Sequence, residues 1–384
     1  MTDSIRVVLD LTKMTRQARM DIDATIGRDI SPLGVVKRQY DKLSTQKSPL
    51  TYAKTSWRTR TELVEGEFVP TKIEANLNIP NAVAGQNVVH GTSVFAAVVS
   101  AFYILKIWMA ESGVPGVELD KLTLADIRIA GVTLSYPEEC DGLADACSLV
   151  QAARDVARTL YREKCTVLSS SNDTVYIDRG DYELTIYNKT DLSHCAFKEG
   201  TPVSALQALA PTIVRIEVKL GARFLQKRVL TSAESWRHAY AEGRYEKLFN
   251  ELVRGTLRLD DHLRCKAPRP EVFAKLTALE AHILRGYLNG RDPRVAKAVL
   301  TSGRPTNRFY ELRRSLMEKS QVDIDIPWAL HRKLRSAELA NRLIYRGDSD
   351  PAPKNANWAF SRSSWDNLRR TMHALYQEAT DKAP

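Results

Sequence analysis

The chain lacks the short signatures of several common enzyme classes. Its 5 cysteines include no CxxC pair, so the sequence favours neither a disulfide framework nor a zinc knuckle. None of its 7 histidines belongs to a His-apolar-His pair, a spacing that often binds a metal. No GxxxxGK[ST] loop occurs, which argues against a nucleotide-driven motor, and no local Ser-His-Asp or Cys-His signature is present. Any catalytic chemistry is therefore expected from other residue types.

Nothing in the sequence indicates a membrane protein. The first residues, MTDSIR, lack the basic region followed by an apolar segment that secretion requires. The most apolar stretch, residues 94–109, is interrupted by Lys106 and falls short of the ~20 residues that span a bilayer. We therefore expect a buried helix at this stretch, no membrane partner, and a cytoplasmic protein.

The sequence does have enough apolar side chains for ordered domains, together with an excess of positive charge. Over 384 residues, 43% hydrophobic and 27% charged side chains are typical of a folded protein, and the length favours two domains. Lysine and arginine number 56 against 46 acidic residues, a net charge of +10. This excess raises the odds of a polyanionic partner such as nucleic acid without identifying one.

Strand patterns and two helical patterns fill the first part of the chain. Alternating β-branched segments predict strands, and apolar residues at intervals of three and four predict helices. The strands are expected at residues 5–11, 71–77, 122–134, 174–177, 182–187 and 212–220, and the helices at 93–111 and 143–161. The Asp-Arg-Gly-Asp turn at 178–181 joins two of the strands into a hairpin. Because the strands occur in hairpins, we expect an α+β domain with a mainly antiparallel sheet over residues 1–231.

The rest of the chain has helical patterns. From about residue 232 the strand patterns vanish, and helices are expected at residues 233–258, 270–288, 292–300, 306–319, 327–344 and 363–380. Residues 347–354 include two prolines and are expected to form a loop. The sequence therefore predicts an α-helical second domain over residues 232–384.

A tyrosine and a lysine share one face of the strand at 182–189. Residues two apart point the same way along a strand, so Tyr187 and Lys189 are expected side by side. A neighbouring cation favours a phenolate and neutralises charge on a phosphoryl group, which suits nucleophilic attack on phosphate. The alternative is an amphipathic edge strand in which Tyr187 packs and Lys189 is solvated.

Acidic residues flanked by cations recur on three of the expected strands. Arg215, Glu217 and Lys219 lie on one strand face, and Glu74 and Asp126 have similar settings on earlier strands. If these strands are neighbours, the three carboxylates converge on one Mg²⁺ or Mn²⁺ ion, for which they are suitable hard ligands. The alternative is a ladder of cross-strand ion pairs on a solvated face.

The helix expected at 306–319 interleaves arginines with aromatic residues and follows the turn Ser302–Pro305. Its first residue, Thr306, is of the capping type, and the whole suits a DNA recognition helix. The candidate contacts to the DNA backbone are Arg304, Arg308, Arg313 and Arg314. The alternative is an exposed basic helix face with no partner.

Five short segments of the first 230 residues also follow one another in an order that is informative when they are taken together. They read VLDLTK at 8–13, IEA at 73–75, GQNV at 85–88, YELTIYNK at 182–189, and VRIEVKL at 214–220 followed by RFL at 223–225. In this order they resemble the gene II/X replication initiation proteins of filamentous phages and related plasmids. A weaker match continues through residues 284–288, 309–314 and 322–326, so the resemblance spans most of the chain.

The resemblance implies a rolling-circle nuclease-like domain followed by a helical DNA-binding or accessory domain. It makes Tyr187 the nucleophile that nicks an origin in double-stranded replicative-form DNA, leaving a 3′-hydroxyl and a 5′-phosphotyrosine. Host polymerase and helicase would then displace a single strand in the bacterial cytoplasm, and the enzyme would rejoin that strand without ATP. Lys189 would assist catalysis, a magnesium or manganese ion would be the cofactor, and the candidate DNA contacts near the nucleophile are Asn87, Arg128, Arg215 and Lys219.

Two positions depart from the family pattern. Gln86 stands where the family usually has His, and Ala130 stands where an Asp usually follows an Arg-Ile pair. Either change could remove a metal ligand, although His90 and Asp126 lie nearby in the sequence. Two alternatives therefore stay open, a non-catalytic DNA-binding regulator of the same fold and a plasmid mobilisation relaxase.

Overall fold

The computed structural model describes residues 2–382, apart from residues 23–25, 31–35, 42–43, 52, 66, 89–90, 162–164, 167–173, 194, 198–200, 240, 262, 264–265, 297–299, 302–303, 306, 332–335 and 347–361. Its largest element is an antiparallel sheet with the strand order β4-β5-β6-β1-β7-β11-β10-β9-β8. These strands are β1 (Thr2–Asp10), β4 (Ser44–Lys47), β5 (Lys54–Val64), β6 (Glu67–Asn78), β7 (Ile127–Glu139), β8 (Cys165–Thr166), β9 (Thr174–Asp178), β10 (Tyr182–Asn188) and β11 (Ile213–Leu220). The α+β class and the mainly antiparallel sheet expected from the sequence are confirmed.

One face of this sheet is apolar and the other is polar, because side chains alternate along each strand. On β1, Ile5, Val7 and Leu9 are completely buried. The strand register aligns such residues across the sheet, and Val218 of β11 lies opposite Leu184 of β10. The continuous apolar face is what holds the helices on one side of the sheet.

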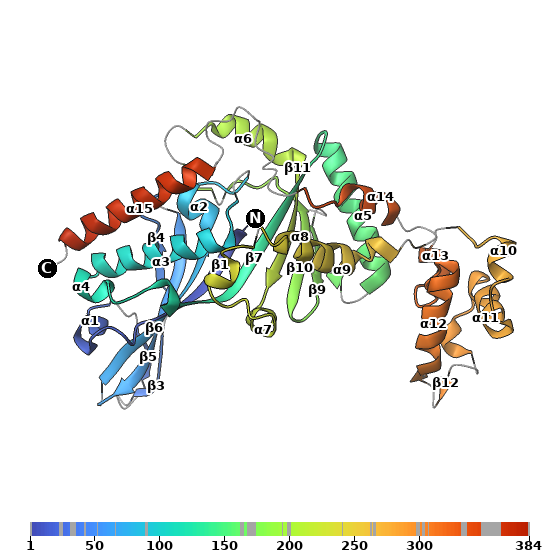
Figure 1. Cartoon of the computed structure of the whole chain (residues 1–384), viewed down its shortest axis with the longest axis horizontal. Helices are drawn as coiled ribbons and strands as arrows, with labels where there is room; N and C mark the ends of the chain where they lie inside the picture. Colours follow the sequence, from blue (N-terminus) through green and yellow to red (C-terminus); the bar gives the residue numbers. More distant parts are fainter. Residues whose placement is uncertain are drawn as a thin grey trace.

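Two long helices cover the apolar face (Figure 1). α3 (Val94–Glu111) packs against β1 and β7, and α5 (Leu143–Tyr161) packs against β9, β10 and β11. α15 (Arg362–Lys382) lies along α3, with Met372 and Tyr376 buried. By length and composition α3 could cross a membrane, but 83% of it is buried inside the protein. The expectation of a buried helix at this stretch is confirmed.

The shorter helices confirm some sequence expectations and correct others. They are α1 (Arg16–Met20), α2 (Ile79–Ala84), α4 (Gly116–Leu119), α6 (Val203–Leu209), α7 (Ala222–Lys227), α8 (Arg244–Phe249), α9 (Gly255–Leu257), α10 (Pro270–Phe273), α11 (Ala278–Leu288), α12 (Asn307–Ser320), α13 (Trp328–His331) and α14 (Ser336–Arg342). Single turns of tighter helix are η1 (Leu124–Asp126), η3 (Ala210–Thr212), η4 (Glu234–Trp236), η6 (Leu259–Asp261) and η7 (Pro293–Val295), and η5 (Asn250–Arg254) is a π-helix. The helix expected at 233–258 is therefore interrupted, and Gly243 adopts a left-handed φ of 61° at the break. Of the helix expected at 292–300 the described residues show η7, whereas the one expected at 306–319 is present as α12.

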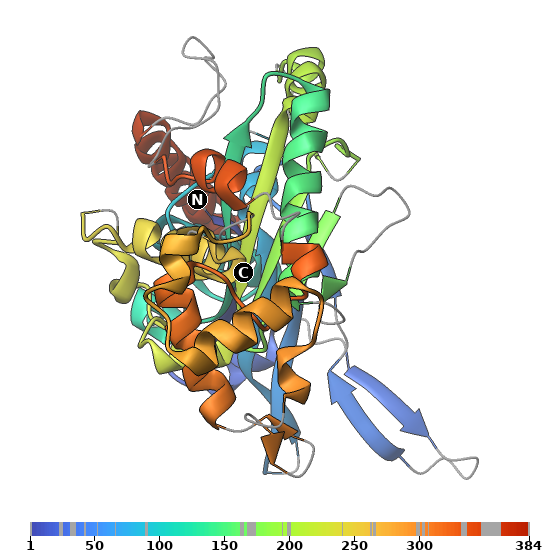
Figure 2. The ribbon, with the colours of Figure 1, turned by 90° about the vertical axis from the view of Figure 1, so that its right-hand side faces the viewer.

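Several elements were not foreseen in the sequence. β4 and β5 extend the sheet beyond β6, and β2 (Ile26–Ile30) pairs with β3 (Val36–Asp41) as a hairpin that projects from the molecule (Figure 2). β12 (Leu300–Thr301) and β13 (Arg304–Pro305) form a small second hairpin. The loop expected at 347–354 lies outside the described residues.

The hydrophobic cores divide the chain differently from the expected boundary at residue 231. Residues beyond it, including Trp236, Phe249 and Tyr376, belong to the core of the sheet. A separate small core forms further along, around Tyr287, Phe309 and neighbouring residues of α11 and α12. We call residues 270–331 the helical module, and Figure 1 shows it projecting from one end of the sheet.

Candidate active site

The expected nucleophile lies on the polar face of the sheet. β10 and β11 are paired so that Tyr187 is opposite Arg215 and Thr185 is opposite Glu217. Alternation then places Tyr187, Arg215 and Glu217 on the same face, away from α5. The structure thus brings Tyr187 beside Arg215 and Glu217, which the sequence had placed together on another strand.

The phenol of Tyr187 donates a hydrogen bond to Oε1 of Glu217 at 2.7 Å. Burial and the Glu217 carboxylate raise the pKa of Tyr187 far above its ordinary range, and Arg215 offsets this only in part. The expectation that the neighbouring Lys189 favours the phenolate is therefore corrected, because the pKa of Tyr187 is raised and not lowered. Burial and the carboxylate of Asp3 also raise the pKa of Glu217, although Arg215 lowers it. Glu217 is thus a strengthened base placed to accept the phenolic proton.

Arg215 holds this pair of residues in position. Its Nη1 donates to Oδ1 of Asp3 at 2.9 Å and to Oε1 of Glu217 at 3.3 Å, and its Nη2 donates to the backbone oxygen of Asn87. The Arg215 side chain is only 2% exposed. Arg215 and the buried Asn87 are therefore internal supports of the site, and the expectation that they contact DNA is corrected.

Asp3 is a site residue that the sequence did not reveal. It lies on β1, two strands away from β11 in the sheet, and accepts hydrogen bonds from the side-chain amides of Asn78 and Asn87, each at 3.3 Å. These contacts fix a second carboxylate beside Arg215. Only the strand order brings it there, because 212 residues separate Asp3 from Arg215.

Lys189 follows directly after β10 and is buried, with 7% of its surface exposed. Its amino group forms no ion pair within the described part of the chain. Burial and the positive charge of Arg215 lower the pKa of Lys189, whereas Asp3, Cys195 and Glu217 raise it. Lys189 is therefore a cation of the Tyr187 site that is not neutralised by a direct carboxylate contact.

The loop Gly85–Val88 and α6 cover one end of the site. Val88, Leu206 and Ile213 form a small apolar cluster there, on the face of the sheet that carries Tyr187. The side chain of Gln86 accepts a hydrogen bond from the backbone of Val88 at 2.7 Å, so its amide oxygen stabilises the loop. His90, the nearest histidine in the sequence, lies outside the described residues.

The three carboxylates expected to share a metal are not brought together. Glu74 is bound by Arg58 at 2.6 Å and Arg60 at 3.0 Å, as in a cross-strand ion-pair ladder. Asp126 precedes β7 in η1 and pairs with Lys13 at 2.8 Å. Two strands lie between β6 and β11, which separates Glu74 from Glu217 by at least ~14 Å.

The described residues therefore do not fit the expected magnesium or manganese site. No group of three or more histidine, cysteine, aspartate or glutamate side chains within them could hold a metal ion. The nearest acidic pair to the nucleophile, Asp3 and Glu217, is already bridged by the guanidinium of Arg215. Ala130, at the second family departure, uses its backbone oxygen to accept a hydrogen bond from Arg6 at 2.9 Å.

The polar sheet face continues from the Tyr187 site across the neighbouring strands. Its cations include the expected DNA contacts Arg128 and Lys219, both exposed. Lys219 pairs with Glu183 at 3.0 Å, a solvated contact that leaves its amino group accessible. Further cations of this face include Arg6 on β1, Arg58 and Arg60 on β5, and Lys72 on β6.

In the helical module the expected DNA contacts have different settings. Arg308 and Arg314 are exposed on α12. Arg313 instead binds the completely buried Asp323 through two hydrogen bonds of 2.7 Å, so its guanidinium is committed to the interior. The backbone of Arg304 is part of β13, and its side chain lies outside the described residues.

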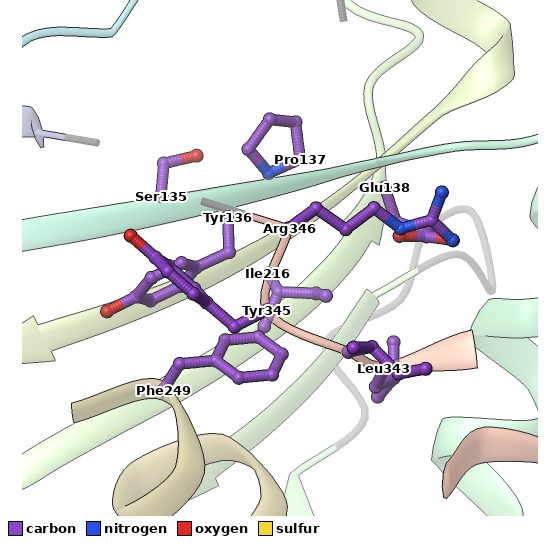
Figure 3. Close-up of a pocket in the computed structure, with 10 residues that line it drawn as sticks. Ser135, Tyr136, Pro137, Glu138, Ile216, Phe249, Leu343, Tyr345 and Arg346 are labelled. Atoms are coloured by element: carbon purple, nitrogen blue, oxygen red, sulfur yellow. The ribbon is translucent and has the colours of Figure 1, made fainter. Parts of the chain in front are cut away.

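A small cavity lies on the opposite, apolar face of the same strands (Figure 3). Tyr136, Ile216, Phe249 and Tyr345 surround it, and its volume is about 30 Å³. Arg346 closes one side through an ion pair with Glu138 at 2.7 Å. This volume suits about one water molecule and is too small for a substrate.

Comparisons with protein-family models, curated proteins and solved structures returned no match for this chain.

Proposed function

We propose that this chain is a DNA-nicking and strand-joining enzyme of the gene II/X type, which starts rolling-circle replication by attack of Tyr187 on origin DNA. The observation that carries the proposal is the hydrogen bond from Tyr187 to Glu217, a base held in place by buried Arg215. A hydroxyl nucleophile, an adjacent base and a third group that orients the base are the parts required to activate a tyrosine. The sequence resemblance supplies the substrate class.

In the proposed reaction Glu217 accepts the phenolic proton while the oxygen of Tyr187 bonds to phosphorus. The bond between phosphorus and the 3′ oxygen breaks, and the proton passes from Glu217 to that oxygen to give a 3′-hydroxyl. The 5′ phosphate remains on Tyr187 as a phosphodiester, so the number of such bonds is unchanged and no ATP is consumed. Attack by a 3′-hydroxyl reverses these steps and rejoins the strand, with Glu217 returning the proton to Tyr187.

The charge of the attacked phosphate needs a nearby cation. Lys189 is suited to this role because it is buried in the site without a direct carboxylate partner in the described residues. A magnesium or manganese ion, when bound, would neutralise the same charge, but the described residues do not fit such a site and no step is assigned to it.

The basic, polar face of the sheet supports DNA as the partner. Arg6, Lys72, Arg128 and Lys219 lie on it, and phosphate groups bind such side chains with release of counterions. We propose that the origin duplex and the displaced strand follow this face to Tyr187, in a bacterial cytoplasm that supplies polymerase and helicase. This arrangement puts contacts that position the backbone beside the reactive group.

The proposal is tested by incubating the protein with supercoiled DNA that carries the origin of its own replicon, with EDTA or with Mg²⁺. We expect nicking and a covalent protein–DNA adduct, both abolished by Tyr187→Phe. Tyr176→Phe is the matched control, because Tyr176 lies opposite Thr185 on the same sheet face. Binding without nicking under any condition contradicts the proposal and favours the DNA-binding regulator, and nicking confined to a transfer origin favours the relaxase.

A further inference from the structure

A second cavity lies between the sheet body and the helical module, and most of the side chains that line it are polar. Its volume is about 440 Å³, within the range of pockets that hold a small molecule or a nucleotide. The end of α5, the β9–β10 turn and α9 form one wall, and η7, α12 and residues 325–326 form the other. We call it the junction cavity, and it is remote from the residues that surround Tyr187.

The walls of the junction cavity are rich in arginine. They include Arg179, Arg258, Arg294 and Arg313, with the single carboxylate Asp325 among the lining residues. Three of these arginines are fixed by ion pairs, Arg294 with Asp325, and Arg258 and Arg313 with Asp323. Arg258 also pairs with Asp261 and Arg313 with Asp325, so carboxylates engage most of the N–H donors of these two side chains and leave Arg179 as the main contact for a ligand.

Arg179 is the exception among the four. It lies in the exposed turn between β9 and β10 and forms no carboxylate contact within the described residues. Its guanidinium stacks over the ring of Tyr161, with 4.9 Å between the guanidinium carbon and the ring centroid. The hydroxyl of Tyr161 is held by the backbone oxygen of Thr256, which fixes the ring as a cavity wall.

We infer that the junction cavity binds one nucleotide of a single DNA strand, at a distance from the phosphodiester that Tyr187 attacks. An arginine stacked on a fixed aromatic ring is a platform for a nucleic-acid base, and arginine forks match phosphate oxygens. The inference rests on the proposed function for the nature of the ligand. Arg179 lies opposite Tyr182 across the β9–β10 turn, so five strand positions, about 17 Å, separate it from Tyr187 and one nucleotide cannot occupy both sites.

The test measures binding of a fluorescent single-stranded oligonucleotide by anisotropy over a series of salt concentrations. Tyr187→Phe protein is used throughout, so that no cleavage occurs. With Arg179→Ala added, we expect affinity to fall about tenfold and the slope of log K against log salt to fall by about 0.7, the share of one single-strand phosphate. Because Arg179 is exposed in a turn, the substitution leaves the core unchanged.

Arg237→Ala is the matched control. Arg237 stacks on Phe95 at 5.3 Å and pairs with Glu234 at 2.9 Å, so its removal deletes the same charge and a similar ring contact elsewhere. Equal affinities and equal salt slopes for the two variants would overturn the inference. Binding of a free deoxynucleoside monophosphate that depends on Arg179, with no effect on the oligonucleotide, would overturn it as well.

The outcomes for the two sites can be told apart by assaying covalent adducts in parallel with intact Tyr187. An adduct in the wild type together with an unchanged salt slope in Arg179→Ala contradicts the junction-cavity inference and still supports the proposed nicking activity. A changed salt slope in Arg179→Ala with no adduct in the wild type supports nucleotide binding in the junction cavity and contradicts the proposed nicking activity.

Discussion

Two clusters of buried charge differ in the balance of acid and base: one lies on the inner strands β10 and β11, and the other lies where the sheet body meets the helical module. In one, the acids Asp3 and Glu217 and the phenol of Tyr187 surround Arg215. In the other, the completely buried Asp323 contacts both Arg258 and Arg313, which also pair with the more exposed Asp261 and Asp325. We call them the Tyr187 cluster and the Asp323 cluster.

The balance of charge decides what each cluster can do. Burial alone would raise the pKa of Asp323, but Arg313 and Arg258 outweigh it and hold this pKa at about 2. In the Tyr187 cluster burial and Asp3 raise the pKa of Glu217, and Arg215 does not overcome them. Two arginines on one buried carboxylate therefore make an ionised anchor, whereas two acids that share one buried arginine leave a carboxyl group able to take up a proton.

The largest expected effect comes from removing the base of the Tyr187 cluster. Glu217→Gln keeps the shape of the side chain but cannot accept the phenolic proton, so we expect nicking to slow about 10²- to 10⁴-fold. In the wild type the rate should rise with pH through an inflection above the ordinary pKa of a glutamate, because Glu217 must be ionised to act. Single-turnover nicking rates across a pH series check both expectations.

Glu183→Gln is the control for this substitution. Glu183 lies on the same strand face as Tyr187 but pairs with the exposed Lys219. Its variant should keep the wild-type rate and pH profile. A Glu217→Gln protein that retains the inflection would show that another group is the base.

The next largest effect is expected on stability, in the Asp323 cluster. Asp323→Asn leaves Arg258 and Arg313 without their shared carboxylate, and breaking a buried pair in this way costs about 3–5 kcal/mol. Asp325→Asn, at a side chain that is 28% exposed, is the milder control and should cost about 1 kcal/mol. Denaturant unfolding measures both, and equal losses would contradict the role given to Asp323.

The lowered pKa of Asp323 also predicts an acid-labile contribution to stability. Because the folded pKa is about 2, below its unfolded value near 4, the contribution is complete above about pH 4 and is lost as the pH falls through about 2. Its size is about 2 kcal/mol. The difference in unfolding free energy between wild type and Asp323→Asn should therefore shrink on acidification, and a constant difference would contradict this assignment.

The smallest effect is expected on the solvated sheet face. Lys219 is 61% exposed where it pairs with Glu183, so Lys219→Ala should change stability by less than about 1 kcal/mol. It should still weaken DNA binding and lower its salt dependence, since phosphate contacts depend on such side chains. Unfolding and binding measurements on the same variant separate the two roles, and a large loss of stability would contradict a solvated position.

The elements that the sequence predicted well are those with a clear period. α3 and α5 have long apolar patterns, and the alternation in β10 and β11 placed Tyr187 and Glu217 on one face correctly. β5 was missed because threonines at 55 and 59 point into the interior beside Trp57, so its buried face does not look apolar in the sequence.

The parts that could not be predicted depend on contacts between distant segments. Spacing shows which face Arg215 occupies, but not that the loop carrying Asn87 covers that face and buries the guanidinium. Asp3 joins the site only because β1 lies beside β7, which in turn lies beside β11. The convergence expected for Glu74 failed for the same reason, because strand order could not be foreseen. Asp126 failed differently, because it lies in η1 before β7 begins and not on a strand face.

The most direct test of the central claim is to locate the covalent bond to DNA. After reaction with an origin oligonucleotide, trypsin should release residues 180–189, which contain both Tyr182 and Tyr187. Fragmentation by mass spectrometry is expected to place a 5′-phosphonucleotide on Tyr187. An adduct on Tyr182 or on another peptide, or DNA nicked with no adduct at any residue, would contradict the account.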